Sequence, residues 1–206
     1  MRLFLIRHGR TPANNERKLV GQKYDGDLIE FGVEQIQKLA CELSSKPISA
    51  IISSPLTRAK HSAEILKDSF INKIPLTTDP RIVERDYGDF ELLNREQLVT
   101  KKANMGIVYG DTTNYFPDSV GGVELRETVF LRMQNSINWA RAKFGNDSIL
   151  AYVTHGGTIY SFITESLRIP EELERPFKIR EASYLECEVD NQNIIEVMAL
   201  WNNPIQ

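Results

Sequence analysis

Residues of unusual chemical type follow three separate apolar runs of the chain. Residues 7–9 (Arg-His-Gly) come directly after the first run, Arg58 lies a few residues past the second, and residues 155–157 (His-Gly-Gly) follow the third. If each run is a strand of one parallel sheet, the three strand ends meet at the edge where open α/β sheets bind their ligands. The spacing therefore predicts one shared site that contains two histidines and two arginines.

The four side chains at this edge suit the transfer of a phosphoryl group. Phosphate monoesters hydrolyse very slowly, and enzymes accelerate the reaction mostly by positioning and by neutralising charge on the equatorial oxygens. A neutral imidazole of His8 would attack phosphorus and form a covalent intermediate, which divides one difficult displacement into two easier ones. Arg7, Arg58 and His155 would neutralise the charge, so neither a metal ion nor another cofactor is expected.

Each of these residues has a simpler interpretation when it is taken alone. His8 would be a hydrogen-bonded core histidine, and Arg58 a solvated arginine whose charge opposes a helix dipole by about 0.3–1 kcal/mol. The backbone N–H groups that begin at Gly156 offer an anion site at a helix start, although a plain strand-to-helix turn has a similar sequence. The hypothesis therefore depends on the convergence of all three segments.

Strands and helices alternate along the chain in the order typical of a three-layer α/β/α sandwich with a mostly parallel central sheet. Continuous apolar runs predict buried strands, and apolar residues three and four apart predict helices. The second helix is expected to begin with Ser54 as N-cap and Pro55 at its first position. The predicted strands cover residues 1–7, 50–52 and 149–154 with a hairpin of 183–189 and 194–201, and the predicted helices cover 33–43, 54–70, 125–144 and 155–170, the last with Ile159, Tyr160, Ile163 and Leu167 inward.

The chain is expected to form a single domain of residues 1–206. Its length and its apolar content of 41% suit one core that buries about 70% of the unfolded surface. Residues 92–122 fit neither the helical nor the strand period well, and we expect them to form a small cap inserted over the site.

Charge and composition exclude several classes of function. The net charge is −3, from 25 basic and 28 acidic residues without long runs of either sign, so neither nucleic acid nor a membrane surface is an expected partner. The apolar stretches are too short for a signal sequence or a membrane span, and we expect a soluble cytoplasmic protein. Cys41 and Cys187 lack ligand-like spacing and are interpreted as buried apolar residues. The sequence leaves the oligomeric state open.

Three segments, in order, resemble the signatures of the histidine phosphatase superfamily. They are Arg7-His8-Gly9 with Asn14 beyond it, residues 53–59 (SSPLTRA) and residues 154–157 (THGG). Together they are far more specific than an Arg-His-Gly tripeptide alone. The resemblance implies that His8 is the phosphorylated nucleophile, that Arg7, Arg58 and His155 surround the phosphoryl oxygens, and that Asn14 hydrogen-bonds the same group.

The resemblance also implies a proton donor for the leaving oxygen. Residues 82–89 (IVERDYGD) resemble the family segment that carries the acid. We assign this role to Glu84, with Asp86 as the nearby competitor. Without the resemblance, a salt bridge of Glu84 with Arg81 or Arg85 in a solvated loop would be the preferred interpretation.

Substrate contacts are a further implication of the resemblance. Arg85 and Tyr87 resemble contacts of the mutase branch, and Gly21 and Gln22 belong to a segment that resembles a substrate-binding loop, with an ordinary loop as the alternative. Ala13 stands where mutases typically carry tryptophan, which weakens a mutase assignment. His61 has no role in the family and is interpreted as a structural or surface residue.

The leading hypothesis is a metal-independent phosphatase that acts on a small phosphorylated substrate. One alternative is a mutase that returns the phosphoryl group to its substrate, and a second is a phosphate-binding module without catalysis on the same fold. The complete set of His8, Arg7, Arg58, His155 and a plausible acid gives no reason to expect inactivity. The substrate would be selected by the cap, whose geometry one sequence does not determine.

Overall fold

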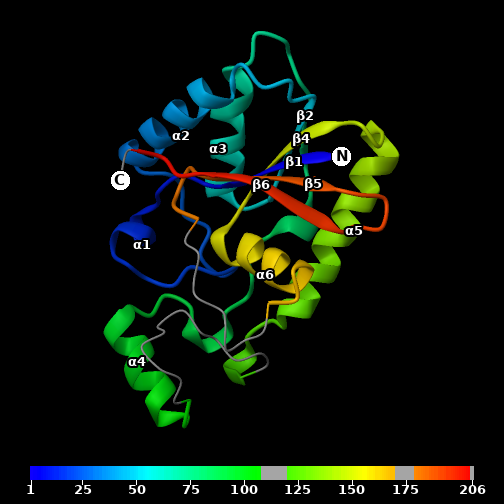
Figure 1. Cartoon of the computed structure of the whole chain (residues 1–206). Helices are drawn as coiled ribbons and strands as arrows, with labels where there is room; N and C mark the ends of the chain where they lie inside the picture. The colour runs from blue at the N-terminus through cyan, green and yellow to red at the C-terminus, as the bar shows by residue number, and fades with distance from the viewer. Residues whose placement is uncertain (108–119, 170–178, 205–206) are drawn as a thin grey trace.

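A six-stranded, mostly parallel sheet forms the middle of the molecule (Figure 1). The computed structural model describes residues 1–107, 120–169 and 179–204. The strand order is β3-β2-β4-β1-β5-β6, in which β3, β2, β4 and β1 run parallel, β5 pairs antiparallel with β1, and β6 pairs antiparallel with β5. This arrangement confirms the predicted α/β class with a mostly parallel sheet.

The predicted strands and helices are present in the predicted order, and β3 and α1 are elements that were not predicted. The strands are β1 (Arg2–Arg7), β2 (Ala50–Ser53), β3 (Leu76–Thr78), β4 (Ile149–Thr154), β5 (Tyr184–Val189) and β6 (Ile195–Trp201). The α-helices are α1 (Pro12–Asn15), α2 (Glu30–Leu43), α3 (Thr57–Asp68), α4 (Arg95–Asn104), α5 (Arg126–Phe144) and α6 (Gly156–Ser166). Short 3₁₀ turns lie at Pro80–Ile82, Gly88–Phe90 and Val120–Gly122.

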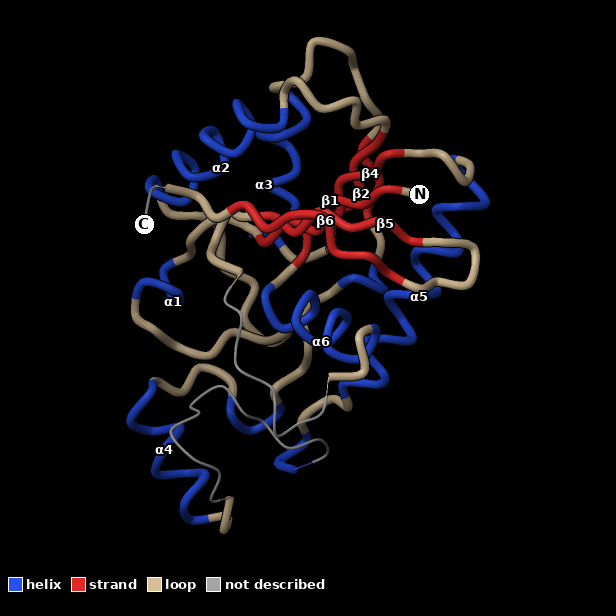
Figure 2. The backbone as a smooth tube through the Cα atoms, viewed as in Figure 1, coloured by secondary structure: helices blue, strands red, loops and turns tan. Residues whose placement is uncertain are grey.

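Two apolar cores lie on opposite faces of the sheet because successive strand residues point in opposite directions. Leu3 and Leu5 of β1 face a core shared with α5 and α6, and Phe4 and Ile6 face a core shared with α2 and α3. Figure 2 shows the strands between these two pairs of helices. The result is the expected three-layer sandwich.

The carboxyl ends of the central strands meet at one edge, as predicted. In the parallel ladder, Arg7 at the end of β1 is in register with Thr154 at the end of β4. Ser53 at the end of β2 is in register with Val153. The residues that follow these three strands are therefore brought to the same place.

Three local predictions were wrong. Ser54 is not the N-cap of α3, because this helix begins at Thr57 and Leu56 occupies the cap position. Cys187 is buried as expected, but Cys41 is exposed, since it is turned about 100° around α2 from the buried Ala40. Leu167 lies beyond the end of α6 and is exposed.

Helix α4 lies in the segment predicted to form the cap, and Figure 1 shows it apart from the layers that cover the sheet. Asn94 and Gln97 form a capping box that starts the helix, with hydrogen bonds of 3.0 and 2.9 Å. Residues 108–119 of the predicted cap lie outside the described part of the chain.

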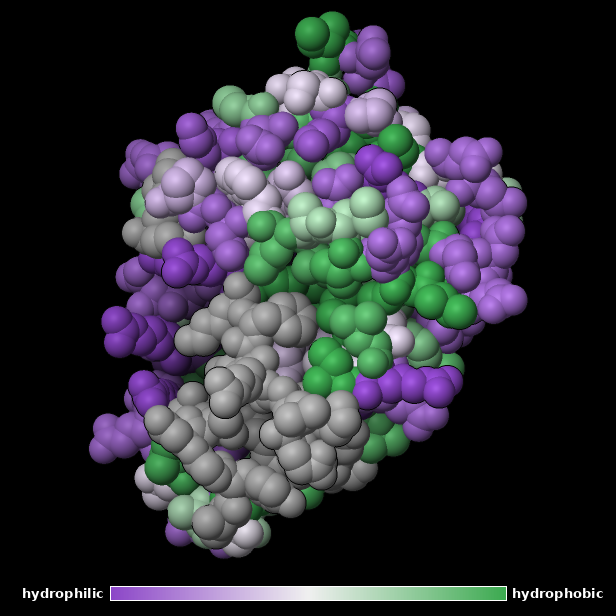
Figure 3. Space-filling view, viewed as in Figure 1, coloured by the Kyte–Doolittle hydropathy of each residue, from purple (hydrophilic) through white to green (hydrophobic). Residues whose placement is uncertain are grey.

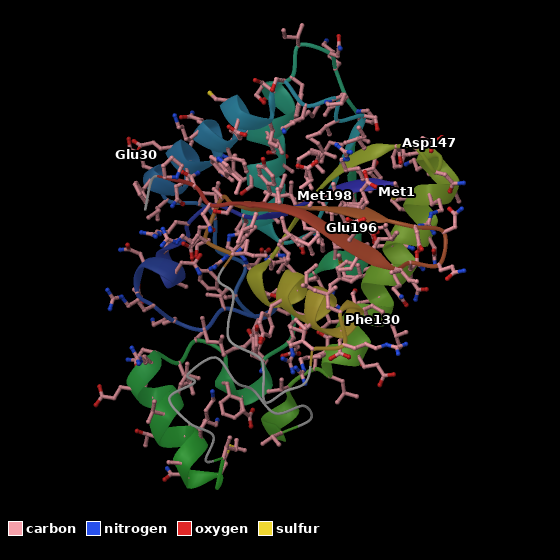
Figure 4. All side chains as sticks on the ribbon, viewed as in Figure 1. Met1, Glu30, Phe130, Asp147, Glu196 and Met198 are labelled. Atoms are coloured by element: carbon pink, nitrogen blue, oxygen red, sulfur yellow. The ribbon has the colours of Figure 1, made fainter. Side chains whose placement is uncertain are left out.

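The outer strand β6 carries exposed apolar side chains, Val197, Met198 and Leu200. Figure 3 shows apolar residues gathered across this face, and Figure 4 places Met198 and Glu196 on β6, with Phe130 on α5. Phe130 stacks on Phe162 of α6 with 6.0 Å between ring centroids, which joins the two helices of this layer. Within the described residues, no helix is both long and apolar enough to cross a membrane.

Candidate active site

His8 lies directly after β1, buried and with a defined tautomer. Its imidazole Nδ1 is 2.7 Å from the carbonyl oxygen of Gly9. A carbonyl only accepts hydrogen bonds, so Nδ1 carries the proton and Nε2 keeps its lone pair in the neutral ring. The Gly9 N–H donates to Ser62 Oγ over 3.1 Å, which ties this turn to α3.

Burial keeps the His8 ring uncharged. The side chain is 2% exposed. Burial is the largest cause that lowers its pKa well below the ordinary value, and the nearby charges of Arg58 and Arg7 lower it further. Removal from water disfavours the imidazolium, and two neighbouring cations disfavour it further. The neutral form, which can act as a nucleophile, is therefore the form present at neutral pH.

Arg58 of α3 faces His8 from the second residue of the helix. Its Nε donates to His8 Nε2 over 3.3 Å, while Nη1 donates to the Tyr24 carbonyl over 2.6 Å and Nη2 to the Gly21 carbonyl over 2.9 Å. The side chain is fully buried. Burial lowers the pKa of Arg58, and the Glu84 carboxylate opposes this effect more than any other nearby group.

Asp25 supplies the helix cap that had been expected from Ser54. Its carboxylate accepts from the backbone N–H of Thr57 over 2.6 Å and from the Thr57 hydroxyl over 3.0 Å. A carboxylate at a helix start satisfies an N–H group that lacks a partner within the helix. Ser54 Oγ accepts from the Leu56 N–H over 3.4 Å, ahead of the helix, and contacts His155 Nε2 at 2.7 Å.

His155 and Arg7, which lie next to His8, each have a buried nitrogen that the site leaves unused. The rings of His8 and His155 lie 5.1 Å apart, edge to face. His155 Nδ1 and Arg7 Nε are buried and have no hydrogen-bond partner among the residues that the structure describes. Buried polar atoms are rarely left unpaired in folded proteins. Arg7 Nε is a donor, and His155 Nδ1 is one when Nε2 accepts from the Ser54 hydroxyl, so the two atoms together suit an anionic acceptor.

The other two nitrogens of the Arg7 guanidinium are fixed from behind. Nη1 donates to the Ile179 carbonyl over 2.9 Å, and Nη2 pairs with Glu181 over 2.6 Å. Arg10 also pairs with Glu181, at 3.4 Å. The orientation of the remaining Nε–H is therefore set by residues outside the site.

The carboxyl group of Glu84 contacts the first turn of α6. Its Oε1 accepts from the backbone N–H groups of Arg85 and Thr158, both over 2.8 Å, and from the Thr158 hydroxyl over 3.2 Å. Its Oε2 accepts from the Gly157 N–H over 3.2 Å. The group at this predicted helix-start site is thus the Glu84 carboxyl itself, and Oε2 is the oxygen that accepts from fewer donors.

Comparisons with known proteins identify the family of the chain. The model of the histidine phosphatase superfamily (branch 1) matches residues 3–204. The chain belongs to this superfamily. It is 31% identical over 198 residues to the probable phosphoglycerate mutase GpmB of Proteus mirabilis, covering 94% of this chain and 86% of that protein.

Solved structures with the same fold carry phosphatase names. A putative α-ribazole-5′-phosphate phosphatase of Escherichia coli superposes with a TM-score of 0.76 at 25% identity, covering 100% of this chain and 98% of the other. A mycobacterial glucosyl-3-phosphoglycerate phosphatase superposes with a TM-score of 0.81 at 24% identity and 98% coverage of both chains. The superfamily membership supports an enzyme of phosphoryl chemistry.

The resemblance also singled out Gly156 and Asn14. Gly156 begins α6, and a side chain there would touch the Arg7 guanidinium at about van der Waals distance. Asn14 is the third residue of α1 and forms a capping box with Thr11, in which its Oδ1 accepts from the Thr11 hydroxyl over 2.9 Å and from the Thr11 N–H over 3.2 Å. The Asn14 oxygen is thus engaged locally.

The predicted substrate-binding loop holds other residues of the site. The Gly21 carbonyl accepts from Arg58, as described above, and Gln22 Nε2 donates to the Glu84 carbonyl over 2.8 Å. Arg85 is buried, and its Nε donates to the Glu124 carbonyl over 2.8 Å. Asp86, the competitor of Glu84, accepts from the Gly88 N–H over 2.7 Å. His61 contacts Asp27 at the surface over 2.7 Å, in agreement with its superficial assignment.

Sequence reasoning missed several residues that hold the site. Arg132 of α5 donates to the carbonyl of Glu84 over 3.2 Å and pairs with Glu124 over 2.9 Å. Ser62 accepts from Gly9, and Ser54 contacts His155. The position of Ser62 one turn after Arg58 on α3 was the one available signal. Within the described residues, no group of three or more potential ligands is placed to hold a metal ion.

Proposed function

We propose that this chain is a metal-independent phosphatase that hydrolyses a small phosphomonoester through a phosphohistidine on His8. The observation that carries the proposal is the environment of His8 Nε2. This nitrogen keeps its lone pair because Nδ1 donates to Gly9. Arg7 Nε and His155 Nδ1 are buried and lack a partner within the described residues, which supports the binding of an anion beside His8 Nε2.

In the first step, the phosphoryl group occupies the space among these donors. The Ser54 hydroxyl donates to His155 Nε2 in this step, so that Nδ1 carries the ring proton. The phosphoryl oxygens accept from Arg58 Nε, Arg7 Nε and His155 Nδ1, and the arginines supply the positive charge that the transition state requires. His8 Nε2 attacks phosphorus, an N–P bond forms, and the ester P–O bond breaks. Protonated Glu84 gives its proton to the leaving oxygen, so the alcohol departs neutral.

In the second step, water replaces the alcohol. The Glu84 carboxylate takes a proton from water, the water oxygen attacks phosphorus, and the N–P bond of phospho-His8 breaks. Inorganic phosphate leaves, and both His8 and Glu84 return to their starting protonation states. The contact of Gly157 and Thr158 with Glu84 holds the carboxylate in place for both steps.

Phosphoryl transfer of the mutase type is the second candidate. The likeness to the probable phosphoglycerate mutase favours it, as does the buried Arg85 beside Glu84, which would add positive charge near a doubly anionic intermediate. Against it, the short side chain of Ala13 is buried in α1, where a mutase typically has an aromatic residue. We therefore place hydrolysis first.

One experiment separates the two candidates. The protein is incubated with 3-phosphoglycerate and a trace of 2,3-bisphosphoglycerate, and in parallel with a panel of sugar phosphates, nucleotides and other phosphomonoesters. We expect release of phosphate from a preferred ester without isomerisation. Formation of 2-phosphoglycerate many times faster than free phosphate would instead establish the mutase.

A further inference from the structure

The loop of residues 19–24 connects the two halves of the site. On one side, the Gly21 and Tyr24 carbonyls accept from the guanidinium of Arg58. On the other side, Gln22 Nε2 donates to the backbone carbonyl of Glu84. A displacement of this loop would therefore move both the group that faces the phosphoryl oxygens and the group that carries the proton.

Glu91 holds this loop in place from the far side. Its Oε1 accepts from the Gln22 N–H over 3.0 Å and from the Tyr87 N–H over 3.3 Å, and its Oε2 accepts from the Lys23 N–H over 2.9 Å. The residue is 9% exposed. Hydrogen bonds to a buried carboxylate are about twice as strong as those between neutral groups.

Gly21 leaves the space that the Glu91 carboxylate occupies. A Cβ built on Gly21 would overlap Oε1 and the carboxyl carbon of Glu91. The carboxylate is thus packed where any other residue would place its side chain. Two backbone pairs, Leu19 N–H to Leu93 O at 3.0 Å and Leu92 N–H to Leu19 O at 2.8 Å, continue the same attachment.

We propose that Glu91 is a positioning residue for phosphoryl transfer, which acts by fixing the 19–24 loop and, through it, Arg58 and Glu84. The inference rests on the proposed function, because it assigns Arg58 and Glu84 their roles. Glu91 itself does not touch the reacting atoms. Its hydrogen bonds go to the backbone of residues 22, 23 and 87 and to the side chain of Asp86.

The first test is a double-mutant cycle that measures phosphate release. Glu91→Gln keeps the shape of the side chain but turns an amide group toward one of the backbone N–H donors. We expect kcat/KM to fall about 10- to 100-fold, the scale of losing a group that orients a catalytic one. Part of the effect is transmitted through Arg58. When Glu91→Gln is added to the Arg58→Ala variant, the factor by which kcat/KM falls should therefore be at least about fivefold smaller. Independent effects would give equal factors in both backgrounds.

The second test leaves Glu91 unchanged and crowds it instead. Gly21→Ala places a methyl group against the carboxylate, and we expect a loss of kcat/KM similar to that of Glu91→Gln. In Glu91→Ala the space is vacated, so adding Gly21→Ala should cost less than about twofold more. This second test remains informative even if Glu91→Gln folds poorly. Thermal melting of every variant reports on folding.

Glu186→Gln is the matched control. Glu186 is also 9% exposed, but it lies on β5 and pairs with Arg2 over 3.3 Å. We expect it to retain wild-type kcat/KM. Loss of activity equal to that of Glu91→Gln would mean that any buried carboxylate matters equally, which overturns the proposal.

Trapping the phosphoenzyme separates this inference from the proposed function. Wild-type protein is mixed with labelled substrate and denatured at alkaline pH, where phosphohistidine survives. If no labelled histidine forms, the proposed function and this inference both fail. If it forms, and Glu91→Gln is as active as the wild type or costs equal factors with and without Arg58, only the role of Glu91 is rejected.

Discussion

The Nε–H group of Arg58 donates to Nε2 of His8 over 3.3 Å. This is the nitrogen that attacks phosphorus in the proposed reaction, so the arginine covers the lone pair of the nucleophile in the free protein. A phosphoryl oxygen carries negative charge and accepts from a guanidinium more strongly than a neutral imidazole does. Substrate binding would therefore draw the N–H of Arg58 to the phosphoryl group and uncover His8 at the same time.

Replacing the nucleophile should abolish turnover and leave the fold intact. In His8→Ala the sheet keeps the buried residues 3–6 of β1, which hold the strand in both cores. We expect no phosphate release and a melting temperature within about 6 °C of the wild type, which corresponds to about 2 kcal/mol in a chain of this size. A well-folded variant with a tenth of the wild-type rate would remove His8 as nucleophile.

Removing the guanidinium that faces His8 should slow the reaction and weaken anion binding together. Arg58→Ala should lower the rate by about 10² to 10³, the scale of losing one preorganised donor to transition-state charge. Inhibition by phosphate and vanadate should weaken in parallel. Arg2→Ala is the control, because its side chain is 40% exposed and pairs with Glu188 at the start of β1. Unchanged inhibition in Arg58→Ala would show that Arg58 does not bind the phosphoryl group.

The buried histidines should make stability depend on pH in the mildly acidic range. Burial lowers the pKa of both His8 and His155 well below the ordinary value, with the charge of Arg58 as the next cause in each. The unfolded chain, with histidine pKa values near 6.5, therefore takes up protons before the folded chain does. The stability that the two neutral histidines contribute is fully present above about pH 6.5, and it is lost as the pH falls toward their folded-state pKa.

Each histidine should contribute a slope of about 1.4 kcal/mol per pH unit below about pH 6. Denaturant unfolding at several pH values would measure this slope in the wild type, in His8→Gln and in His155→Gln. We expect each variant to have a shallower slope than the wild type, since it lacks one protonation on unfolding. Equal slopes in all three proteins would mean that the two rings are not held neutral by the fold.

The positions of His8, Arg58 and His155 could be predicted because they depend on short-range signals. An apolar run of a few residues identifies a buried strand, and parallel strands bring their carboxyl ends to one edge. The register between Arg7 and Thr154 shows this effect directly. The charge state of His8 could not be predicted, because it depends on burial and on the neighbouring arginines.

Hydrogen bonds between segments that are far apart in the chain could not be predicted from the sequence. Ser54 followed by proline is a typical helix start, but Asp25 accepts from the first turn of α3 and Ser54 contacts His155 instead. The carboxylate of Glu84 occupies the start of α6, although these segments are more than seventy residues apart. Local patterns cannot decide between two hydrogen-bond partners when one of them comes from elsewhere in the chain.

Chelation should leave the activity unchanged. The positive charge that the transition state requires comes from Arg7 and Arg58 in the proposed mechanism. Phosphate release measured after treatment with EDTA and gel filtration should equal that of untreated protein, with an Mg²⁺-dependent phosphatase inactivated in parallel as the control. Strong loss that magnesium or zinc restores would contradict the mechanism.

Glu84→Gln should slow both chemical steps, and the first step should become sensitive to the leaving group. The amide oxygen can still accept from Arg85 and Thr158, while the amide nitrogen meets the N–H of Gly157, so folding should weaken by only about 1 kcal/mol. Loss of a general acid costs about 10²- to 10⁴-fold for alkyl phosphates, whose leaving oxygen needs a proton. p-Nitrophenyl phosphate has a good leaving group and should lose much less in this step.

The same variant should accumulate the covalent intermediate. With p-nitrophenyl phosphate, phospho-His8 would form at a rate close to that of the wild type but hydrolyse slowly, because no carboxylate activates water. A burst of nitrophenolate equal to the enzyme concentration, with phosphohistidine trapped by an alkaline quench, is the expected result. Asp86→Asn is the matched comparison, since Asp86 lies two residues away and accepts from Gly88. If Asp86→Asn shows the burst and the leaving-group dependence while Glu84→Gln does not, the acid is Asp86, and the roles of His8, Arg58 and His155 stand unchanged.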